Sequence, residues 1–250
     1  MTEEAIWSVA SAGLQLSSNE VHIWRAFLDV DSTVRERFST FLSRGEQERA
    51  ARFAFAKDRD RFAMARAILR QLLGGYLSKP PQDVLFETYA HGKPKLSAAP
   101  GISSLKFNLS HSKELALFAF CYEHEVGIDV EKIRPEVASE GIENHYFSAK
   151  ERMELDALAP RLRAKGFFLC WTRKEAYVKA RGEGLHVPLD SFDVSLSPEE
   201  PPVLSSADRD RWSLYSVRPG EGFVGALVAE GHQHCLRYWE WSESNTSLSR

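Results

Sequence analysis

Two carboxylates stand two positions apart in the segment Val126–Glu131, whose sequence is VGIDVE. Side chains two apart on a β-strand share a face, so a strand here would place Asp129 and Glu131 side by side. Mg²⁺ prefers carboxylate oxygens together with waters and substrate phosphates, and one or two protein carboxylates usually hold it. The pair predicts a magnesium site. The alternative is the solvated outer face of an edge strand.

A third carboxylate, Glu175, lies in the predicted helix around Trp171–Lys179. Its 3, 4, 3 spacing places it on one apolar stripe with Phe168, Trp171 and Val178. That stripe is the face expected to be buried, and a buried carboxylate needs a partner. An ion pair with Lys179, four residues on, would be worth only about 0.3–0.5 kcal/mol. A metal ion shared with the strand acids compensates better.

Several basic and small polar side chains are candidates for binding phosphate. Lys174 and Lys179 flank Glu175 and can act as point charges, although solvated lysines on a helix are the alternative. Ser110 and His111 end a predicted strand at a turn, where donors can converge on an anion, and a turn serine with a structural histidine is the alternative. Lys93 lies in a Gly-Lys-Pro turn. Arg44–Arg70 holds seven arginines and one lysine against four acids, which fits either a phosphate site or a solvated helical face.

The elements that must position these residues follow one order twice. Residues 21–28 alternate as a strand, and Ser43-x-x-Glu46 predicts a helix start, followed by a second helix that ends at Gly74-Gly75. Ser148-x-x-Glu151 repeats the capping pattern 105 positions later, and predicted strands over 192–196, 212–217, 223–229 and 236–241 complete the second set. We expect an α+β fold of two similar halves, 1–123 and 124–250, related by a pseudo-twofold duplication, with the site in the cleft between them.

The composition is that of an ordinary globular chain, with 250 residues, 43% hydrophobic, 27% charged and a net charge of −3. This charge gives no general attraction to nucleic acid or anionic lipid. No stretch reaches the ~18 apolar residues of a membrane-spanning helix, and the start MTEE is acidic where a secretory signal is basic. Three widely spaced cysteines predict reduced thiols. We expect a cytoplasmic monomer without nucleic-acid or membrane partners.

Three segments together resemble a known family. FNLSHS at 107–112, GIDVE at 127–131 and W-x-x-KEA-x-x-K at 171–179 match, in order and spacing, the signatures of 4'-phosphopantetheinyl transferases of the Sfp type. Gly92-Lys93-Pro94 and Phe147-Ser148-x-x-Glu151 are also similar to that family, so the resemblance spans about residues 41–196. The third motif is similar to that of the W/KEA subgroup.

The resemblance implies two α+β halves with coenzyme A and Mg²⁺ in the cleft. It makes Asp129, Glu131 and Glu175 the Mg²⁺ ligands, and Ser110, His111, Lys93 and Lys174 the phosphate contacts. It makes Lys179 a second cation at the diphosphate and Arg49 a contact to the 3'-phosphate. Arg61 is a further residue that the resemblance implies in cofactor binding. Glu175, Lys179 and His111 are the residues expected to act in catalysis. Many members place a basic residue before Gly-Lys-Pro, where this chain has His91.

The implied reaction moves the 4'-phosphopantetheine of coenzyme A onto a serine of an apo acyl or peptidyl carrier protein and releases adenosine 3',5'-bisphosphate. Phosphoryl transfer needs an in-line nucleophile and neutralised oxygens, which Mg²⁺, Lys174, Lys179 and His111 would supply. Glu175 is the candidate to accept the serine proton. Two alternatives remain open: another Mg²⁺-dependent nucleotidyl- or phosphotransferase, and a carrier-binding module without catalysis.

Overall fold

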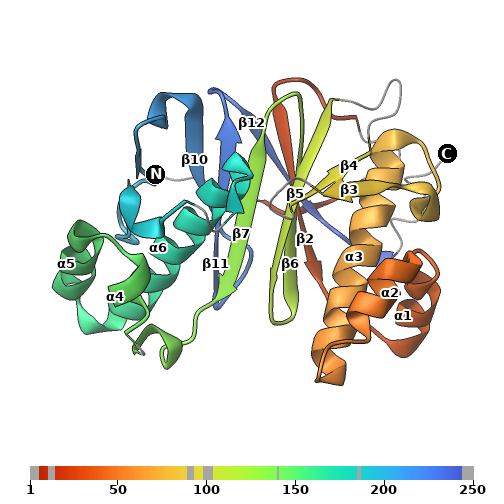
Figure 1. Ribbon diagram of the computed structural model, residues 1–250, viewed down its shortest axis with the longest axis horizontal. Coiled ribbons are helices and arrows are strands. Elements are labelled where there is room, and N and C mark those ends of the chain that lie inside the picture. The colour runs from red at the N-terminus through yellow and green to blue at the C-terminus, as the bar shows by residue number, and fades with distance from the viewer. Residues whose placement is uncertain are drawn as a thin grey trace.

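The structure is a computed structural model that describes residues 6–10, 15–88, 93–97, 104–139, 141–184 and 187–243. Two β-sheets lie face to face in the middle, and the longer helices cover their outer sides (Figure 1). In these ranges no helix has the length and apolar content to cross a membrane. The three cysteines are unpaired, as predicted.

The first sheet has five strands in the order β1-β12-β2-β6-β5. These strands are β1 (Ser8–Val9), β12 (Cys235–Glu240), β2 (Glu20–Phe27), β6 (Leu115–Tyr122) and β5 (Leu105–Ser112). Its helices are α1 (Ser32–Ser39), α2 (Arg44–Ala50) and the 22-residue α3 (Ala56–Leu77). A short hairpin, β3 (Phe86–Thr88) with β4 (Pro94–Leu96), follows α3.

The second sheet has three strands in the order β10-β11-β7. These are β10 (Trp212–Val217), β11 (Phe223–Glu230) and β7 (Val126–Lys132). Its helices are α4 (Glu143–Tyr146), α5 (Ala149–Ala157) and the 22-residue α6 (Pro160–Arg181), and β8 (Asp193–Val194) pairs with β9 (Leu204–Ser205).

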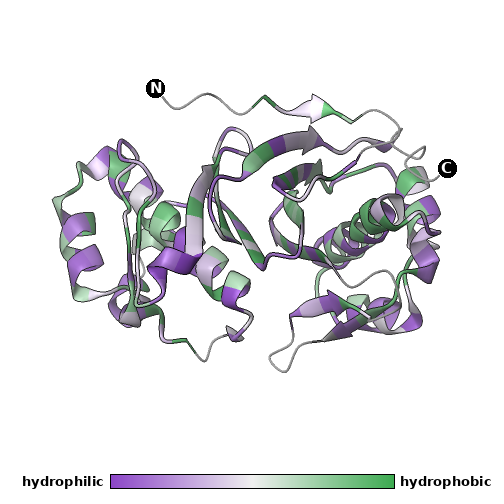
Figure 2. Cartoon of the chain, turned by 90° about the horizontal axis from the view of Figure 1, so that it is seen from above, coloured by the Kyte–Doolittle hydropathy of each residue, from purple (hydrophilic) through white to green (hydrophobic). Residues whose placement is uncertain are grey.

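Alternation along the strands divides the interior into three apolar clusters. On β7, Val126, Ile128 and Val130 face the first sheet, so Asp129 and Glu131 are left on the face toward α6. On β6, Leu117 and Ala119 join the same inter-sheet cluster, whereas Phe118 and Phe120 pack in the cluster with α3. Hydrophobic and hydrophilic bands alternate along the strands in Figure 2. The predicted period of two is therefore confirmed where it positions the acids.

Both predicted capping boxes are present. Ser43 and Glu46 exchange side-chain and backbone hydrogen bonds at the start of α2, as do Ser148 and Glu151 at the start of α5. The predicted end of the second helix is wrong, because α3 continues through Gly74-Gly75 to Leu77. Burial of the α3 face outweighs the low helix propensity of glycine, and a Cβ at Gly74 would lie 2.6 Å from the Lys79 carbonyl oxygen. Helix α1 was not predicted.

The two halves share a strand order and a buried ion pair. Strands β2-β6-β5 and β7-β11-β10 have corresponding pairings. In each half the capping-box glutamate binds a cation of the long helix: Glu46 pairs with Arg70 at 2.6 Å, and Glu151 with Lys174 at 2.8 Å. These features support the duplication and the division near residue 123, which stay predictions.

Strand β12 corrects one part of the expected repeat. Residues 236–241 were expected to complete the second half, but β12 lies in the first sheet, between β1 and β2 and parallel to both. Nothing in the local sequence specifies this partner, because strand pairing depends on distant residues. The chain therefore crosses between the halves after β6 and again after β11.

The closest approach between sheet and helix occurs at Gly127. A Cβ on this residue would lie 2.1 Å from the Ala176 carbonyl oxygen and 2.3 Å from the Ala180 nitrogen. The backbone of α6 thus rests directly on the backbone of β7, and only glycine leaves room for this contact. The contact fixes the residues that neighbour Ala176 and Ala180 on the helix, Glu175 and Lys179, relative to Asp129.

Replacing Gly127 with Ala should destabilise the fold, because the methyl group must push two backbones apart. Overpacking of this kind costs about 1–3 kcal/mol. Gly45→Ala is the matched control, because a Cβ there meets nothing within 4 Å. Urea unfolding should give a lower midpoint for Gly127→Ala and no loss for Gly45→Ala. Equal midpoints for the two variants would contradict the close contact.

Candidate functional site

A ladder of side-chain hydrogen bonds joins β5 to β7. The two strands are the edges of different sheets, so no backbone ladder connects them. Instead Asn108 Oδ1 accepts from the Ile128 backbone nitrogen at 2.9 Å, Ser110 Oγ donates to Asp129 Oδ1 at 2.6 Å, and Ser112 Oγ donates to Glu131 Oε2 at 2.6 Å. Three alternate residues of β5 therefore fix the position of β7 and its two acids relative to the first sheet.

Asp129 is the most buried of the three predicted metal ligands, with 4% of its surface exposed. Its Oδ1 also accepts from Lys179 Nζ at 2.6 Å. Its Oδ2 is buried and has no hydrogen-bond partner in the described part of the chain. An unpartnered buried carboxylate oxygen is costly, so this atom calls for a cation or a donor.

Glu131 and Glu175 complete the acidic cluster. Burial raises the pKa of Glu175, and the negative charges of Asp129 and Glu131 raise it further. The pKa of Glu131 is also raised, first by burial and in part by Asp129, although its hydrogen bond from Ser112 opposes the shift. Carboxylates that raise one another's pKa lie close enough to repel.

This donor set fits a hard divalent cation. The unpartnered Asp129 Oδ2 and the mutual repulsion of the three acids would both be relieved by one. As they stand, no three His, Cys, Asp or Glu side chains of the described ranges are grouped closely enough to coordinate a single ion. Asp129, Glu131 and Glu175 as Mg²⁺ ligands therefore stay a prediction.

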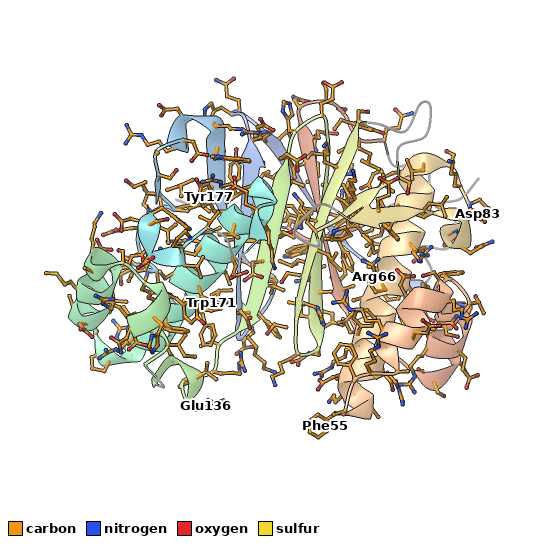
Figure 3. The ribbon with its side chains drawn as sticks, viewed as in Figure 1. Phe55, Arg66, Asp83, Glu136, Trp171 and Tyr177 are labelled. Atoms are coloured by element: carbon orange, nitrogen blue, oxygen red, sulfur yellow. The ribbon has the colours of Figure 1, made fainter. Side chains whose placement is uncertain are left out.

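Lys179 binds Asp129 rather than Glu175. Its Nζ donates to Asp129 Oδ1 and, at 3.1 Å, to Ser110 Oγ. No side-chain hydrogen bond or ion pair joins the Glu175 carboxylate to any residue that the structure describes, so the alternative of an ion pair within the helix is wrong. Trp171, labelled in Figure 3, lies one turn before Glu175. Its ring packs edge-on against that of Tyr146, with ring centroids 5.5 Å apart.

Lys174 corrects the prediction of a phosphate contact. Its side chain is fully buried, and its Nζ binds Glu151 Oε1 at 2.8 Å, the Leu189 carbonyl at 2.6 Å and the Phe192 carbonyl at 2.7 Å. Successive helix residues point about 100° apart, so Lys174 enters the core of the second half while Glu175 faces β7.

The Lys93 side chain lies beside the start of β7. Its Nζ binds Glu125 Oε2 at 3.0 Å and the Val126 carbonyl at 3.1 Å. Burial lowers the pKa of its ammonium, and the Glu125 charge opposes that shift. This position does not itself place Lys93 on a phosphate, so the contact stays a prediction. His91 and Gly92 lie outside the described residues.

His111 faces the other end of the cleft, toward the start of α3. With Arg61 it lines a pocket of about 260 Å³. Surrounding protein lowers the pKa of the imidazole, and the positive charges of Lys179 and Arg61 lower it further. Both oxygens of Asp29 bind the Arg61 guanidinium at 2.7 Å, so Arg61 is largely committed before any phosphate arrives.

Arg49 lies in a separate groove of about 610 Å³ that Gly45, Arg52 and Phe53 also line. Its guanidinium stacks over the Phe62 ring at 5.2 Å and stays exposed. Its predicted contact to the 3'-phosphate, like that of Ser110 to a phosphate, is untested by the geometry. The residues that sequence reasoning missed are Asn108 and Ser112, although their alternation with Ser110 was visible.

Comparison with known proteins identifies the family. Profiles described as "4'-phosphopantetheinyl transferase superfamily" and "4'-phosphopantetheinyl transferase, N-terminal" match residues 125–229 and 32–123. The 4'-phosphopantetheinyl transferase HetI of Nostoc sp. is 38% identical over 235 residues, 94% of this chain and 98% of its own. The 4'-phosphopantetheinyl transferase Sfp of Bacillus subtilis is 33% identical over 161 residues, 64% of this chain and 69% of its own.

A more distant likeness is found among solved structures. A holo-(acyl-carrier-protein) synthase from Bacillus anthracis in complex with CoA (3',5'-ADP) covers 42% of this chain and 94% of its own, with 23% identity and a TM-score of 0.35. That likeness is too slight to carry an argument. The two family profiles, together with HetI, which matches along nearly its whole length, establish the family. The chain belongs to the 4'-phosphopantetheinyl transferase superfamily.

Proposed function

We propose that the protein transfers 4'-phosphopantetheine from coenzyme A to a serine hydroxyl of an apo acyl or peptidyl carrier protein. The serine oxygen would form a bond to the phosphorus that carries pantetheine, and the bond from that phosphorus to the bridging oxygen would break. The pair of electrons leaves with adenosine 3',5'-bisphosphate. The observation that supports this reaction most directly is the acid cluster with an unpartnered Asp129 oxygen beside Lys179.

In this proposal Asp129, Glu131 and Glu175 hold Mg²⁺, which when bound neutralises charge on the diphosphate. Lys179 bridges Asp129 and Ser110, so it stands where a phosphate oxygen next to the metal ligands would meet a cation. His111 contacts the diphosphate from the α3 side. Lys179 is held in place before substrate binds, which is what phosphoryl transfer requires of its charged groups.

Glu175 is the group proposed to accept the serine proton. Its raised pKa makes the carboxylate a stronger base than an exposed glutamate, and it has no hydrogen bond among the described residues that would have to break first. The sequence around it, with Trp171 and Lys174-Glu175-Ala176, supports placement in the W/KEA subgroup. A monomer that acts in the cytoplasm, without nucleic-acid or membrane partners, stays the expectation from the sequence.

A mass assay tests the reaction and its acceptor together. The protein, coenzyme A and Mg²⁺ are incubated with a panel of apo carrier proteins, and the carriers are weighed. A carrier heavier by one phosphopantetheine, with adenosine 3',5'-bisphosphate released, is expected. Transfer of a nucleotide to the carrier would instead indicate another Mg²⁺-dependent nucleotidyl- or phosphotransferase. Binding of the carrier without a change in its mass would indicate a carrier-binding module without catalysis.

Asp129→Asn should lower transfer by about 10²-fold or more, because the neutral amide cannot hold a cation beside the diphosphate. Mg²⁺ binding, measured by calorimetry with coenzyme A present and no carrier protein, should weaken in parallel. Asp156→Asn is the control, because that acid is exposed and pairs with Arg163 on the far side of the second half. Unchanged metal binding in Asp129→Asn would remove Asp129 from the ligand set.

Glu175→Gln should lower kcat by about 10²-fold and yet stabilise the fold at pH 7. The folded state penalises the charged form of Glu175, since its pKa is raised, so stability is lost as pH rises above the unfolded value. Removing the charge restores that stability. The stability effect applies to the metal-free protein, and wild-type kcat should fall as pH falls through the pKa that Glu175 has with the cation bound. Glu154→Gln, in α5 where the half-exposed acid faces Lys150 at 3.8 Å, should change neither property, and a normal rate in Glu175→Gln would exclude Glu175 as the base.

Coenzyme A binding should be accompanied by proton uptake at His111. The pKa of His111 lies below its ordinary value in the free protein, and a diphosphate beside it would raise that value, so affinity should increase as pH falls through the pKa of the bound imidazole. Calorimetry in two buffers of different ionisation enthalpy measures the uptake. His111→Asn should abolish it and weaken binding about tenfold, whereas His145→Asn, on exposed α4, should not. Equal uptake in all three proteins would move His111 away from the diphosphate.

A further inference from the structure

The turn between β5 and β6 holds a lysine in a backbone conformation that lysine rarely adopts. Lys113 has a φ of 53°. This left-handed region favours Gly, Asn and Asp, because a Cβ there crowds the following carbonyl oxygen. A glycine at this position would form the same turn without strain.

The neighbouring residue keeps the turn in this conformation. The carboxylate of Glu114 binds Lys132 of β7 at 2.5 Å and faces Arg61 of α3 at 3.6 Å. Its carbonyl oxygen accepts a hydrogen bond from the Leu28 nitrogen at 2.8 Å. Three other segments therefore fix the turn, and strain that the surroundings maintain is common at binding and catalytic sites.

Lys113 lines the same 260 Å³ pocket as His111, together with two arginines. The charge of each arginine is already balanced: Arg61 is bound by both oxygens of Asp29, and Arg134 faces Glu131 at 3.5 Å. No hydrogen bond or ion pair joins Lys113 to any residue that the structure describes. Its ammonium thus has no ion-pair partner among the described residues that line this pocket.

Of the two acids in the pocket, Glu131 is engaged by Ser112 and Arg134. The other, Asp58, stands in the first turn of α3, where the free backbone N–H groups of the helix favour a carboxylate. Neither acid therefore depends on Lys113. Cations from α3, from the turn and from the loop after β7 enter one small pocket, which suits the oxygens of a phosphate. The pocket is too small for a helix of a carrier protein.

We propose that Lys113 binds a phosphate group of coenzyme A in this pocket and that the strained turn serves to present it. This inference rests on the proposed function, because coenzyme A is the substrate that brings the phosphate. Lys113 would add a contact from the β5–β6 turn, in a pocket that the predicted Mg²⁺ ligand Glu131 also lines.

Lys113→Gly separates the two properties of the turn, since it removes both the charge and the strain. We expect KM for coenzyme A to rise about fivefold, while KM for the carrier and kcat stay unchanged. The Tm should rise by about 1 to 4 °C, because glycine adopts this φ freely. A loss of binding in a more stable protein cannot come from misfolding.

Two further variants isolate the cause. Lys113→Arg keeps the charge and should keep the wild-type KM. Gln233→Gly relieves a similar φ of 62° in the exposed turn between β11 and β12, so it should raise the Tm and leave KM unchanged. An unchanged coenzyme A KM in Lys113→Gly, or a rise confined to the carrier KM, would overturn the proposal. A lower Tm in that variant would overturn its strain component.

Direct binding distinguishes failure of this inference from failure of the proposed function. Coenzyme A, without carrier protein, is titrated into the wild type and Lys113→Gly by calorimetry. Weaker binding to the variant is expected even if the wild type modifies no carrier, in which case only the proposed function fails. Equal binding to both proteins overturns the role of Lys113, whatever the transfer assay shows.

Discussion

The contact between two backbones at Gly127 is the constraint on which the site depends. Because α6 rests on β7 without a side chain between them, Glu175 and Lys179 are held close to Asp129 of β7. Packing of α6 on β7 brings the carboxylates of Asp129 and Glu175 together with the ammonium of Lys179. Attraction between these charges is not what assembles the cluster. A larger residue at 127 would move the acid of the helix away from the acids of the strand.

The second constraint is the side-chain ladder from β5 to β7, which crosses between the sheets. Asn108, Ser110 and Ser112 each bond to β7, so the site is made by both halves. The halves are nevertheless unequal. If Arg70 and Lys174 are equivalent positions, Gln71 stands where Glu175 does, and its amide oxygen accepts from Trp241 at 2.7 Å. The first half then has a neutral side chain at the position that Glu175 occupies in the second half, and its amide oxygen is already hydrogen-bonded.

The sequence predicted what depends on local pattern. Alternation placed Asp129 and Glu131 on one face, and the capping boxes located two helix starts. The placement of Lys174 failed because its partners, Glu151 and two carbonyls after the helix, are distant in the chain. The end of α3 and the position of β12 failed for the same reason, since burial and strand pairing decide both. Family membership was reached from three short motifs, whereas the metal and phosphate roles of individual residues await measurement.

The position of β12 has a consequence for biosynthesis. Its residues, Cys235–Glu240, lie between β1 and β2, which the ribosome releases more than two hundred residues earlier. Domains commonly fold as they emerge, N-terminal part first, but here the first sheet stays open on the β2 edge until β12 has been synthesised. An exposed β2 edge is a surface on which nascent chains can associate. Truncation before residue 235 would leave that edge uncovered, even though every predicted site residue would already have been made.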